Sequence, residues 1–180
     1  MNDLVREYGG ALFELAEDEK QADEILSQTR AIKDFFGRDS DYVRLLSSPN
    51  IAIEERIGAV CEAFDGKVNK FISSFIKLMT ERGYARYIAD SFGEYERRYL
   101  EKNNISVVTV RSAVALSDAQ KSALIEKLEK KTGKKIELEA KVDPSLIGGI
   151  SVYVDGKLYD GTVSAHIDKI RRALYDISIN

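Results

Sequence analysis

The spacing of apolar residues in this 180-residue chain changes once, at Asn103-Asn104. Before this pair, apolar residues recur three and four positions apart, which is typical of one face of an α-helix. After it, they begin to alternate with polar residues, which is typical of a half-buried β-strand. Two asparagines after a long helical pattern also favour a turn. The sequence therefore predicts two modules, a helical one over residues 1–103 and a mixed one over residues 104–180.

The first module is predicted to be an N-terminal six-helix bundle. Turn-forming residues separate the helical patterns, among them Gly37, Pro49, Gly66 and Gly83. The expected helices cover about residues 4–16, 21–36, 41–46, 53–64, 68–82 and 85–102. Gly9-Gly10 lies inside the first of them, where each glycine costs about 1 kcal/mol relative to alanine. We therefore expect tertiary packing to stabilise this helix.

The second module is predicted to combine a small sheet with two helices in the order β-α-β-β-α. Residues 105–111 are rich in valine and threonine and form the first expected strand. Ser117-Asp118-Ala119-Gln120 has the capping-box pattern that opens a helix, and Thr162 can cap the last one. Residues 136–142 alternate between apolar and polar, and Asp155-Gly156 marks a hairpin turn. The predicted fold class is therefore α+β.

The composition argues against several classes of protein. The chain has 27 Lys and Arg against 30 Asp and Glu, a formal net charge of -3, whereas non-specific nucleic-acid binding requires a basic excess. The sequence lacks the apolar run of about 18 residues that a membrane span needs, and its acidic start is unlike a signal peptide. Cys61 is the only cysteine, so no disulfide can form within the chain and a reducing compartment fits best. We expect neither nucleic-acid binding nor membrane insertion.

No group of residues matches a known catalytic arrangement. Cys61 and His166 are the only cysteine and histidine and lie far apart in the sequence, which argues against a zinc site or a catalytic dyad. Gly148-Gly149 lacks the Lys-Ser/Thr pair of a phosphate-binding loop, so a tight bend entering a strand fits better. Ser145 lies beside Asp143 without a nearby base, as a turn residue would. We therefore expect no catalytic residue, no cofactor and no metal.

Two predicted helices have wider apolar faces than packing on the outside of a bundle requires. About 100° of apolar face is enough for such packing. The first helix spreads its apolar residues over about 140° and the fifth over about 160°. Deeper burial by neighbouring helices would explain the surplus width. A groove that accepts a partner helix would explain it equally well.

Four segments of the sequence resemble the ATP synthase delta subunit family, whose mitochondrial counterpart is the oligomycin-sensitivity-conferring protein. Residues 8–16 are similar to the family's Tyr-Ala-x-Ala-Leu-Phe opening, and residues 75–83 to its helix with an acidic-Asn-Gly-Arg end. Residues 142–150 and 159–163 resemble the signature Asp-x-Ser-x-x-Gly-Gly followed by Asp-Gly-Ser-Val. The chain departs from the family at Ser164-Ala165-His166-Ile167, where Arg-Gly-Arg-Leu is usual.

The resemblance implies a non-catalytic peripheral-stalk (stator) subunit of F-type ATP synthase. Such a subunit links the catalytic alpha/beta head to the b-subunit stalk and resists rotor torque during proton-driven ATP synthesis. The first module would hold the N-terminal helix of an alpha subunit, and the second would bind the C-terminus of the b subunit. The protein would be peripheral, at the cytoplasmic face of a bacterial inner membrane.

The resemblance also places the groove for the alpha-subunit helix between the first and fifth helices. The residues that it maps to one wall are Tyr8, Ala11 and Leu15. Those that it maps to the other wall are Phe75, Leu78 and Met79, with Glu81 as a polar contact at the rim.

Two other functions stay open at this point. A helical bundle of this kind could be a general protein-interaction or regulatory module with no link to energy coupling. A small-molecule enzyme would need convergent titratable groups in a pocket, for which the sequence supplies carboxylates and lysines but no motif.

Overall fold

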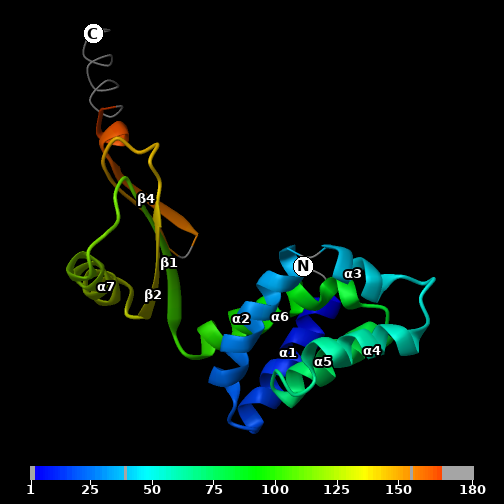
Figure 1. Cartoon of the computed structure of the whole chain (residues 1–180). Helices are drawn as coiled ribbons and strands as arrows, with labels where there is room; N and C mark the ends of the chain where they lie inside the picture. The colour runs from blue at the N-terminus through cyan, green and yellow to red at the C-terminus, as the bar shows by residue number, and fades with distance from the viewer. Residues whose placement is uncertain (1–2, 39, 155, 168–180) are drawn as a thin grey trace. The chain divides into compact units, whose positions relative to one another are not determined.

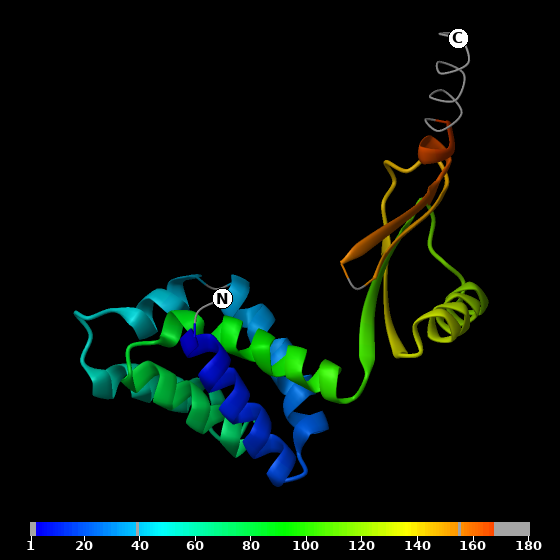
Figure 2. The same ribbon diagram turned by 180° about the vertical axis from the view of Figure 1, so that it is seen from behind.

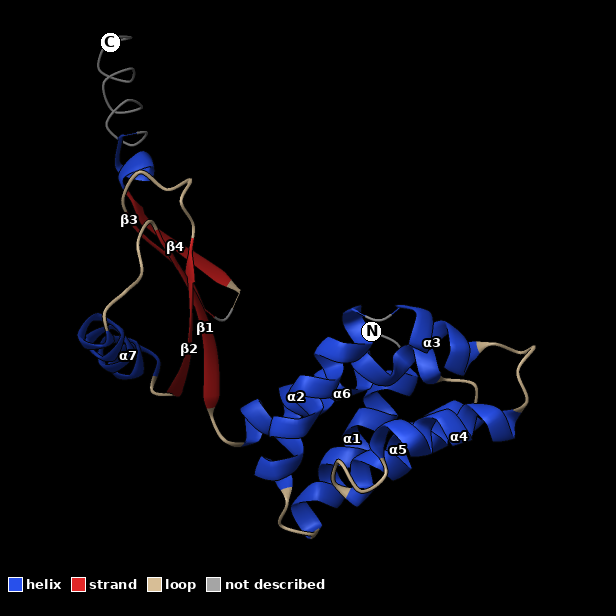
Figure 3. Cartoon of the chain, in the orientation of Figure 1, coloured by secondary structure: helices blue, strands red, loops and turns tan. Residues whose placement is uncertain are grey.

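The computed structural model describes residues 3–38, 40–154 and 156–167. The chain divides into two compact units, Met1–Lys102 and Asn103–Asn180 (Figure 1). The described part of the first unit is helical, and the four-stranded sheet belongs to the second (Figure 3). The predicted α+β class is therefore confirmed.

The helices of the first unit follow the apolar periodicity closely. Each begins and ends within a few residues of its expected position, and the last is preceded by a short 3-10 helix, η1, which the periodicity did not indicate. The elements are α1 (Asp3–Asp18), α2 (Ala22–Arg38), α3 (Ser40–Ser47), α4 (Ile53–Phe64), α5 (Lys70–Glu81), η1 (Ala85–Tyr87) and α6 (Ile88–Lys102).

Helix α6 packs against both α1 and α2 (Figure 2). Its residues Ile88, Phe92 and Tyr95 are fully buried at the spacing expected for one helical face. The Tyr95 ring meets Phe13 of α1 edge to face with centroids 5.7 Å apart. The Tyr95 hydroxyl donates a 2.9 Å hydrogen bond to the Ala22 carbonyl at the start of α2. One side chain of α6 therefore connects two other helices.

The start of α5 is fixed against α2 by Asn69. The Asn69 side chain caps α5 by accepting a 3.0 Å hydrogen bond from the Phe71 backbone N–H. Its amide nitrogen also donates to the Gln21 side chain at 2.8 Å. The Asn69 backbone N–H donates to the Gln28 side chain at 2.7 Å. These bonds orient the N-terminal end of α5.

The second unit contains one strand more than the predicted β-α-β-β-α order. Its elements are β1 (Ile105–Ser112), α7 (Asp118–Thr132), β2 (Lys135–Val142), β3 (Gly149–Val154) and β4 (Lys157–Thr162). The predicted order is wrong on this point because the hairpin after β2 contributes two strands of its own. The spatial order is β2-β1-β3-β4, with β1 and β2 parallel and the other neighbours antiparallel. The expected last helix begins at residue 163, and most of it lies outside the described residues.

Helix α7 covers one face of this sheet. Val108 and Val110 of β1 are buried together with Val152 and Val154 of β3, and Leu124 and Leu128 are among the residues packed against them. The capping box at the start of α7 is present in full, since the Ser117 and Gln120 side chains each accept from the other's backbone N–H. On β2, Lys135, Glu137, Glu139 and Lys141 occupy the positions that alternate with the apolar ones.

The glycine-rich signature of the second unit stabilises a bend. Gly149 has a φ of 84°, and a Cβ atom there would lie 2.3 Å from the Gly161 carbonyl oxygen of β4. Asp143 accepts hydrogen bonds from the backbone N–H and the hydroxyl of Ser145, at 3.1 and 2.5 Å. Gly148 accepts a 3.0 Å backbone bond from Val163. These contacts support the tight-bend interpretation of Gly148-Gly149.

Candidate functional site: an apolar groove between α1 and α5

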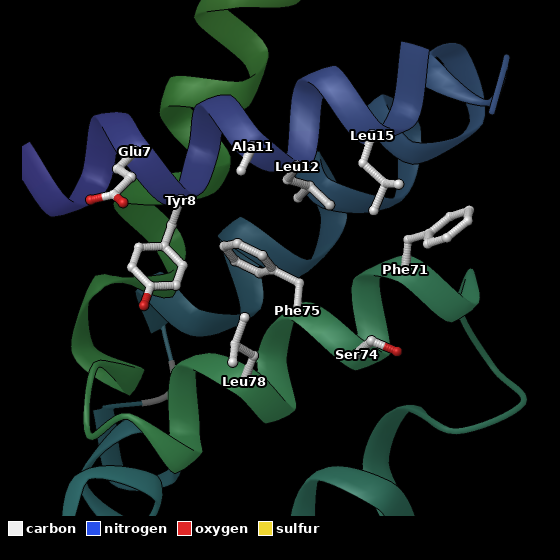
Figure 4. Close-up of a pocket in the computed structure, with 9 residues that line it drawn as sticks. All are labelled: Glu7, Tyr8, Ala11, Leu12, Leu15, Phe71, Ser74, Phe75 and Leu78. Atoms are coloured by element: carbon white, nitrogen blue, oxygen red, sulfur yellow. The ribbon is translucent and has the colours of Figure 1, made fainter. Parts of the chain in front are cut away.

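A groove of about 400 Å³ runs between α1 and α5 (Figure 4). The residues that line it are Glu7, Tyr8, Ala11, Leu12, Leu15, Phe71, Ser74, Phe75 and Leu78. Leu12 and Phe75 are buried, whereas Leu15 and Leu78 remain substantially exposed. The groove is thus lined mainly by apolar and aromatic side chains, some of which still contact solvent.

The α1 wall is one face of a regular helix. Tyr8, Ala11, Leu12 and Leu15 are three or four positions apart and therefore lie above one another. The Tyr8 ring packs edge to face against Tyr84, with centroids 6.0 Å apart. Tyr84 is not among the residues that line the groove, so it supports the Tyr8 ring from outside the groove.

The α5 wall explains why the apolar face of this helix is so wide. Phe71, Ser74, Phe75 and Leu78 line the groove. The adjacent positions Ile72, Ile76 and Met79 are fully buried. Helix α5 therefore has two neighbouring apolar faces, one in the core of the unit and one in the groove. The surplus width of the pattern comes from the groove rather than from complete burial.

The structure brings together Tyr8, Ala11, Leu15, Phe75 and Leu78, which are five of the seven residues that the family resemblance mapped to the groove. The other two lie elsewhere. Met79 is in the core of the unit, because it follows Leu78 by about 100° around the helix. Glu81 is exposed at the end of α5 and is not among the lining residues. Whether any of the seven residues binds a partner stays a prediction.

Four lining residues were missed by the sequence analysis. Phe71 and Ser74 precede the predicted Phe75 and Leu78 by one helical turn, so extending the same spacing would have found them. Leu12 follows Tyr8 by one turn. Glu7 is charged, and a search based on apolar stripes excludes it.

An acidic side chain at the end of α4 holds α5 from the side away from the groove. Asp65 accepts hydrogen bonds from the side chains of Lys77, at 2.7 Å, and Ser73. These two hydrogen bonds lower the pKa of Asp65 to about 2. The bond from Lys77 is the main cause, and the bond from Ser73 is the second. Lys77 and Ser73 both belong to α5. Asp65 therefore connects the turn after α4 to the helix that forms the second groove wall.

A second hollow in the first unit, of about 430 Å³, has a charged lining. It includes Glu94, whose side chain is only 1% exposed. Arg97 donates two hydrogen bonds to Glu94, at 2.6 and 2.7 Å, and Arg98 donates a third at 3.1 Å. These hydrogen bonds lower the pKa of Glu94, and those from Arg97 are the largest cause. The buried carboxylate is thus fully engaged by its neighbours.

The chemistry of the α1–α5 groove suits binding better than catalysis. Of the nine lining residues, only Glu7 and Tyr8 carry titratable groups, and none is a histidine or a cysteine. Within the described residues, no group of three or more His, Cys, Asp or Glu could hold a metal ion. Among the helices described, none has both the length and the apolarity needed to cross a membrane.

Comparisons with known proteins agree along the whole chain. The sequence pattern of the ATP synthase delta (OSCP) subunit family matches residues 4–174. The ATP synthase subunit delta of Clostridium botulinum (strain Loch Maree / Type A3) is 33% identical over 171 residues, which are 95% of this chain and 96% of that protein. The ATP synthase subunit delta of Clostridium kluyveri (strain ATCC 8527) is 28% identical over 171 residues, 95% of this chain and 94% of that protein.

The fold is also found among solved structures. A chain in the cryo-EM structure of the Toxoplasma gondii mitochondrial ATP synthase hexamer superposes with a TM-score of 0.69 at 15% identity, covering 96% of this chain and 97% of that one. The family match covers nearly the whole chain, and the relatives match over almost their full length. The chain therefore belongs to the ATP synthase delta (OSCP) subunit family, and it is a non-catalytic peripheral-stalk subunit of F-type ATP synthase.

Proposed function

We propose that the first unit, residues 1–102, is the six-helix bundle that caps the catalytic head and holds the N-terminal helix of an alpha subunit in the α1–α5 groove. The observation that carries the proposal is the pair of facing walls. Each wall presents side chains at helical spacing, and the space between them is apolar. An amphipathic helix that enters such a groove binds through anchors at positions i, i+3 or i+4 and i+7. Burial of a few of these anchors supplies most of the affinity.

The second unit, residues 103–180, has exposed apolar side chains at one end of its sheet. Val114 is 72% exposed and Ile147 is 77% exposed, and Val142, Val163 and Ile167 are also exposed. Backbone bonds bring their loops together, since Asp143 N–H donates to the Ser112 carbonyl at 2.9 Å and Val163 N–H donates to the Gly148 carbonyl at 3.0 Å. Exposed apolar side chains gathered at one end of a sheet are typical of an interaction site. We infer that this end binds the C-terminus of the stalk b subunit.

The function that follows is mechanical. A chain bound to the head at one unit and to the stalk at the other prevents the head from turning with the rotor. Rotation then drives ATP synthesis in the head instead of being lost as slip. The chain breaks no covalent bond in this process. It acts as a peripheral protein at the cytoplasmic face of the bacterial inner membrane, without inserting into the lipid.

Two measurements test the proposal. The full-length chain, tagged and purified from cells that produce it, should return with the alpha, beta and b subunits. Calorimetry should show that a synthetic peptide of the alpha-subunit N-terminus binds the isolated chain with one-to-one stoichiometry. A folded chain that purifies without these subunits and does not bind the peptide would contradict the proposal and would favour a general interaction module.

A further inference from the structure

Helix α1 approaches α6 closely where it carries two glycines. A Cβ atom at Gly9 would lie 2.5 Å from the Ser91 carbonyl oxygen and 2.8 Å from the Cβ atom of Glu94. A Cβ atom at Gly10 would lie 2.5 Å from the guanidinium group of Arg98. At Gly9 only glycine leaves room for the backbone neighbour with the helices in their present positions, and at Gly10 only glycine leaves room for Arg98 in its present place. The glycines that weaken α1 as an isolated helix therefore permit its packing against α6.

The Arg98 guanidinium lies over Gly10 and contacts α1 on either side of it. Its Nη2 donates to the Arg6 carbonyl oxygen at 3.3 Å, and its Nη1 lies 3.5 Å from the Glu14 carboxylate. Its Nε donates to the buried Glu94 at 3.1 Å, which orients the group from the α6 side. Arg98 thus holds α1 against α6 at two points that are about two helical turns apart.

The face of α1 that contacts α6 is opposite the face that lines the groove. At 3.6 residues per turn, Gly9 and Ala11 point about 200° apart, and Phe13 and Leu15 are separated by the same angle. Ala11 and Leu15 line the groove, whereas Gly9 and Phe13 are buried on the other side. Any displacement of α1 away from α6 therefore moves the groove wall formed by Tyr8, Ala11 and Leu15.

We propose that Gly9, Gly10 and Arg98 are positioning residues for the groove. They set the distance of α1 from α6 and thereby the width of the groove between α1 and α5. None of the three lines the groove, so they affect binding of the helix only through the position of α1. The proposal rests on the function proposed above, in which this groove receives a helix of the alpha subunit.

The Gly9→Ala variant of the full-length chain tests this most directly, because the clash is with a backbone carbonyl that no side-chain rotation can move. We expect its affinity for the synthetic alpha-subunit N-terminal peptide, measured by calorimetry, to fall by roughly tenfold or more, as when one good apolar anchor is lost. Gly58→Ala on α4 is the matched control, since a Cβ atom there meets nothing within 4 Å. It should bind like the wild type.

A second control separates positioning from general loss of stability. Val60 is fully buried in α4 and does not line the groove, so Val60→Ala should lower the unfolding temperature without moving α1. We expect Val60→Ala to retain wild-type peptide affinity at a temperature where both variants are folded. If Val60→Ala and Gly9→Ala lose affinity in proportion to their stability, the positioning role is refuted.

The link between Gly10 and Arg98 is tested by a double-mutant cycle. A Cβ atom at Gly10 collides with the flexible end of Arg98, so Gly10→Ala should act mainly by displacing that side chain. We expect Gly10→Ala and Arg98→Ala each to weaken peptide binding, and the double variant to be no weaker than the poorer single one. Additive losses would contradict the shared role.

Failure of the positioning role can be told apart from failure of the proposed function. If the wild-type chain does not bind the peptide, the proposed function is refuted. The positioning role is then judged by the methyl NMR resonances of Leu15 and Leu78, which line the two walls. Gly9→Ala should shift both resonances more than Val60→Ala does. Equal shifts in the two variants, or unchanged peptide binding by Gly9→Ala, would overturn it.

Discussion

Leu78 and Met79 are consecutive residues of α5, yet Leu78 is 38% exposed at the groove while Met79 is completely buried in the core. Two neighbouring side chains of similar size therefore belong to different surfaces of one helix. Truncating each of them should have different effects on stability and on binding.

The Met79→Ala and Leu78→Ala variants should differ in their free energy of unfolding. We expect Met79→Ala to reduce the free energy of unfolding by about 2–5 kcal/mol, because it opens a cavity in a packed core. Leu78→Ala should cost well under half as much, because its side chain already contacts solvent. Urea denaturation of the full-length chain, followed by circular dichroism, provides the measurement. Equal losses would mean that Leu78 is covered in solution.

Peptide binding should depend on Leu78 and Tyr8. We expect Leu78→Glu to weaken binding of the alpha-subunit peptide by roughly 30-fold or more, because a carboxylate in the groove loses hydration when the helix covers it. Tyr8→Ala should weaken it by roughly tenfold. Leu158→Glu, at an exposed position of β4, is the control and should bind normally. Unchanged calorimetric affinity in the first two variants would exclude the groove as the binding site.

Acid stability should depend on Asp65. Its pKa is lowered to about 2 in the folded chain, first by the Lys77 hydrogen bond and then by Ser73, from an ordinary value of 3.8. A lowered pKa means that the folded state binds this proton less readily than the unfolded state does. The stabilisation is therefore complete above about pH 4 and is lost as the pH falls towards 2.

Asp65→Asn removes this titration and provides the test. We expect the variant to be less stable than the wild type near neutral pH, with a difference that shrinks between about pH 4 and pH 2. Urea midpoints across this range give the measurement. Asp41→Asn is a suitable comparison, because Asp41 pairs with Arg44 at an exposed site. A constant difference between wild type and Asp65→Asn across the range would refute the assignment.

The bend before β3 should tolerate no side chain. Gly149 and Gly156 both have left-handed φ values, of 84° and 79°, but a Cβ atom at Gly156 meets nothing within 4 Å. Gly156→Ala should therefore cost only the conformational penalty of about 1–2 kcal/mol. Gly149→Ala should cost more, because the added atom collides with the backbone of β4. Amide hydrogen exchange in β3 and β4 reports both costs, and equal effects would contradict the close approach.

Local patterns were enough to predict the helices α1 to α7 and the capping box at Ser117, but the predicted order of the second unit was one strand short and η1 was not indicated. The wide apolar faces of the first and fifth helices were visible in the sequence, but the groove between them and five of its lining residues came from the family resemblance. Met79 was wrongly assigned to the groove, because its place was taken from the family pattern rather than from its angle around the helix next to Leu78. The sequence led us to expect tertiary packing at Gly9-Gly10, but its partners could not be predicted, since Ser91 and Arg98 are distant in sequence. The parallel pairing of β1 with β2 is non-local in the same way.

The charged positions of β2 have a consequence for the subunit before it joins the synthase. Among the strands of the described residues, β2 lies at one edge of the sheet, with β1 as its one neighbour. Lysine and glutamate on an edge strand oppose pairing with a strand of another molecule. Newly made chains that have not yet met their partners can therefore accumulate without sticking to each other along this edge.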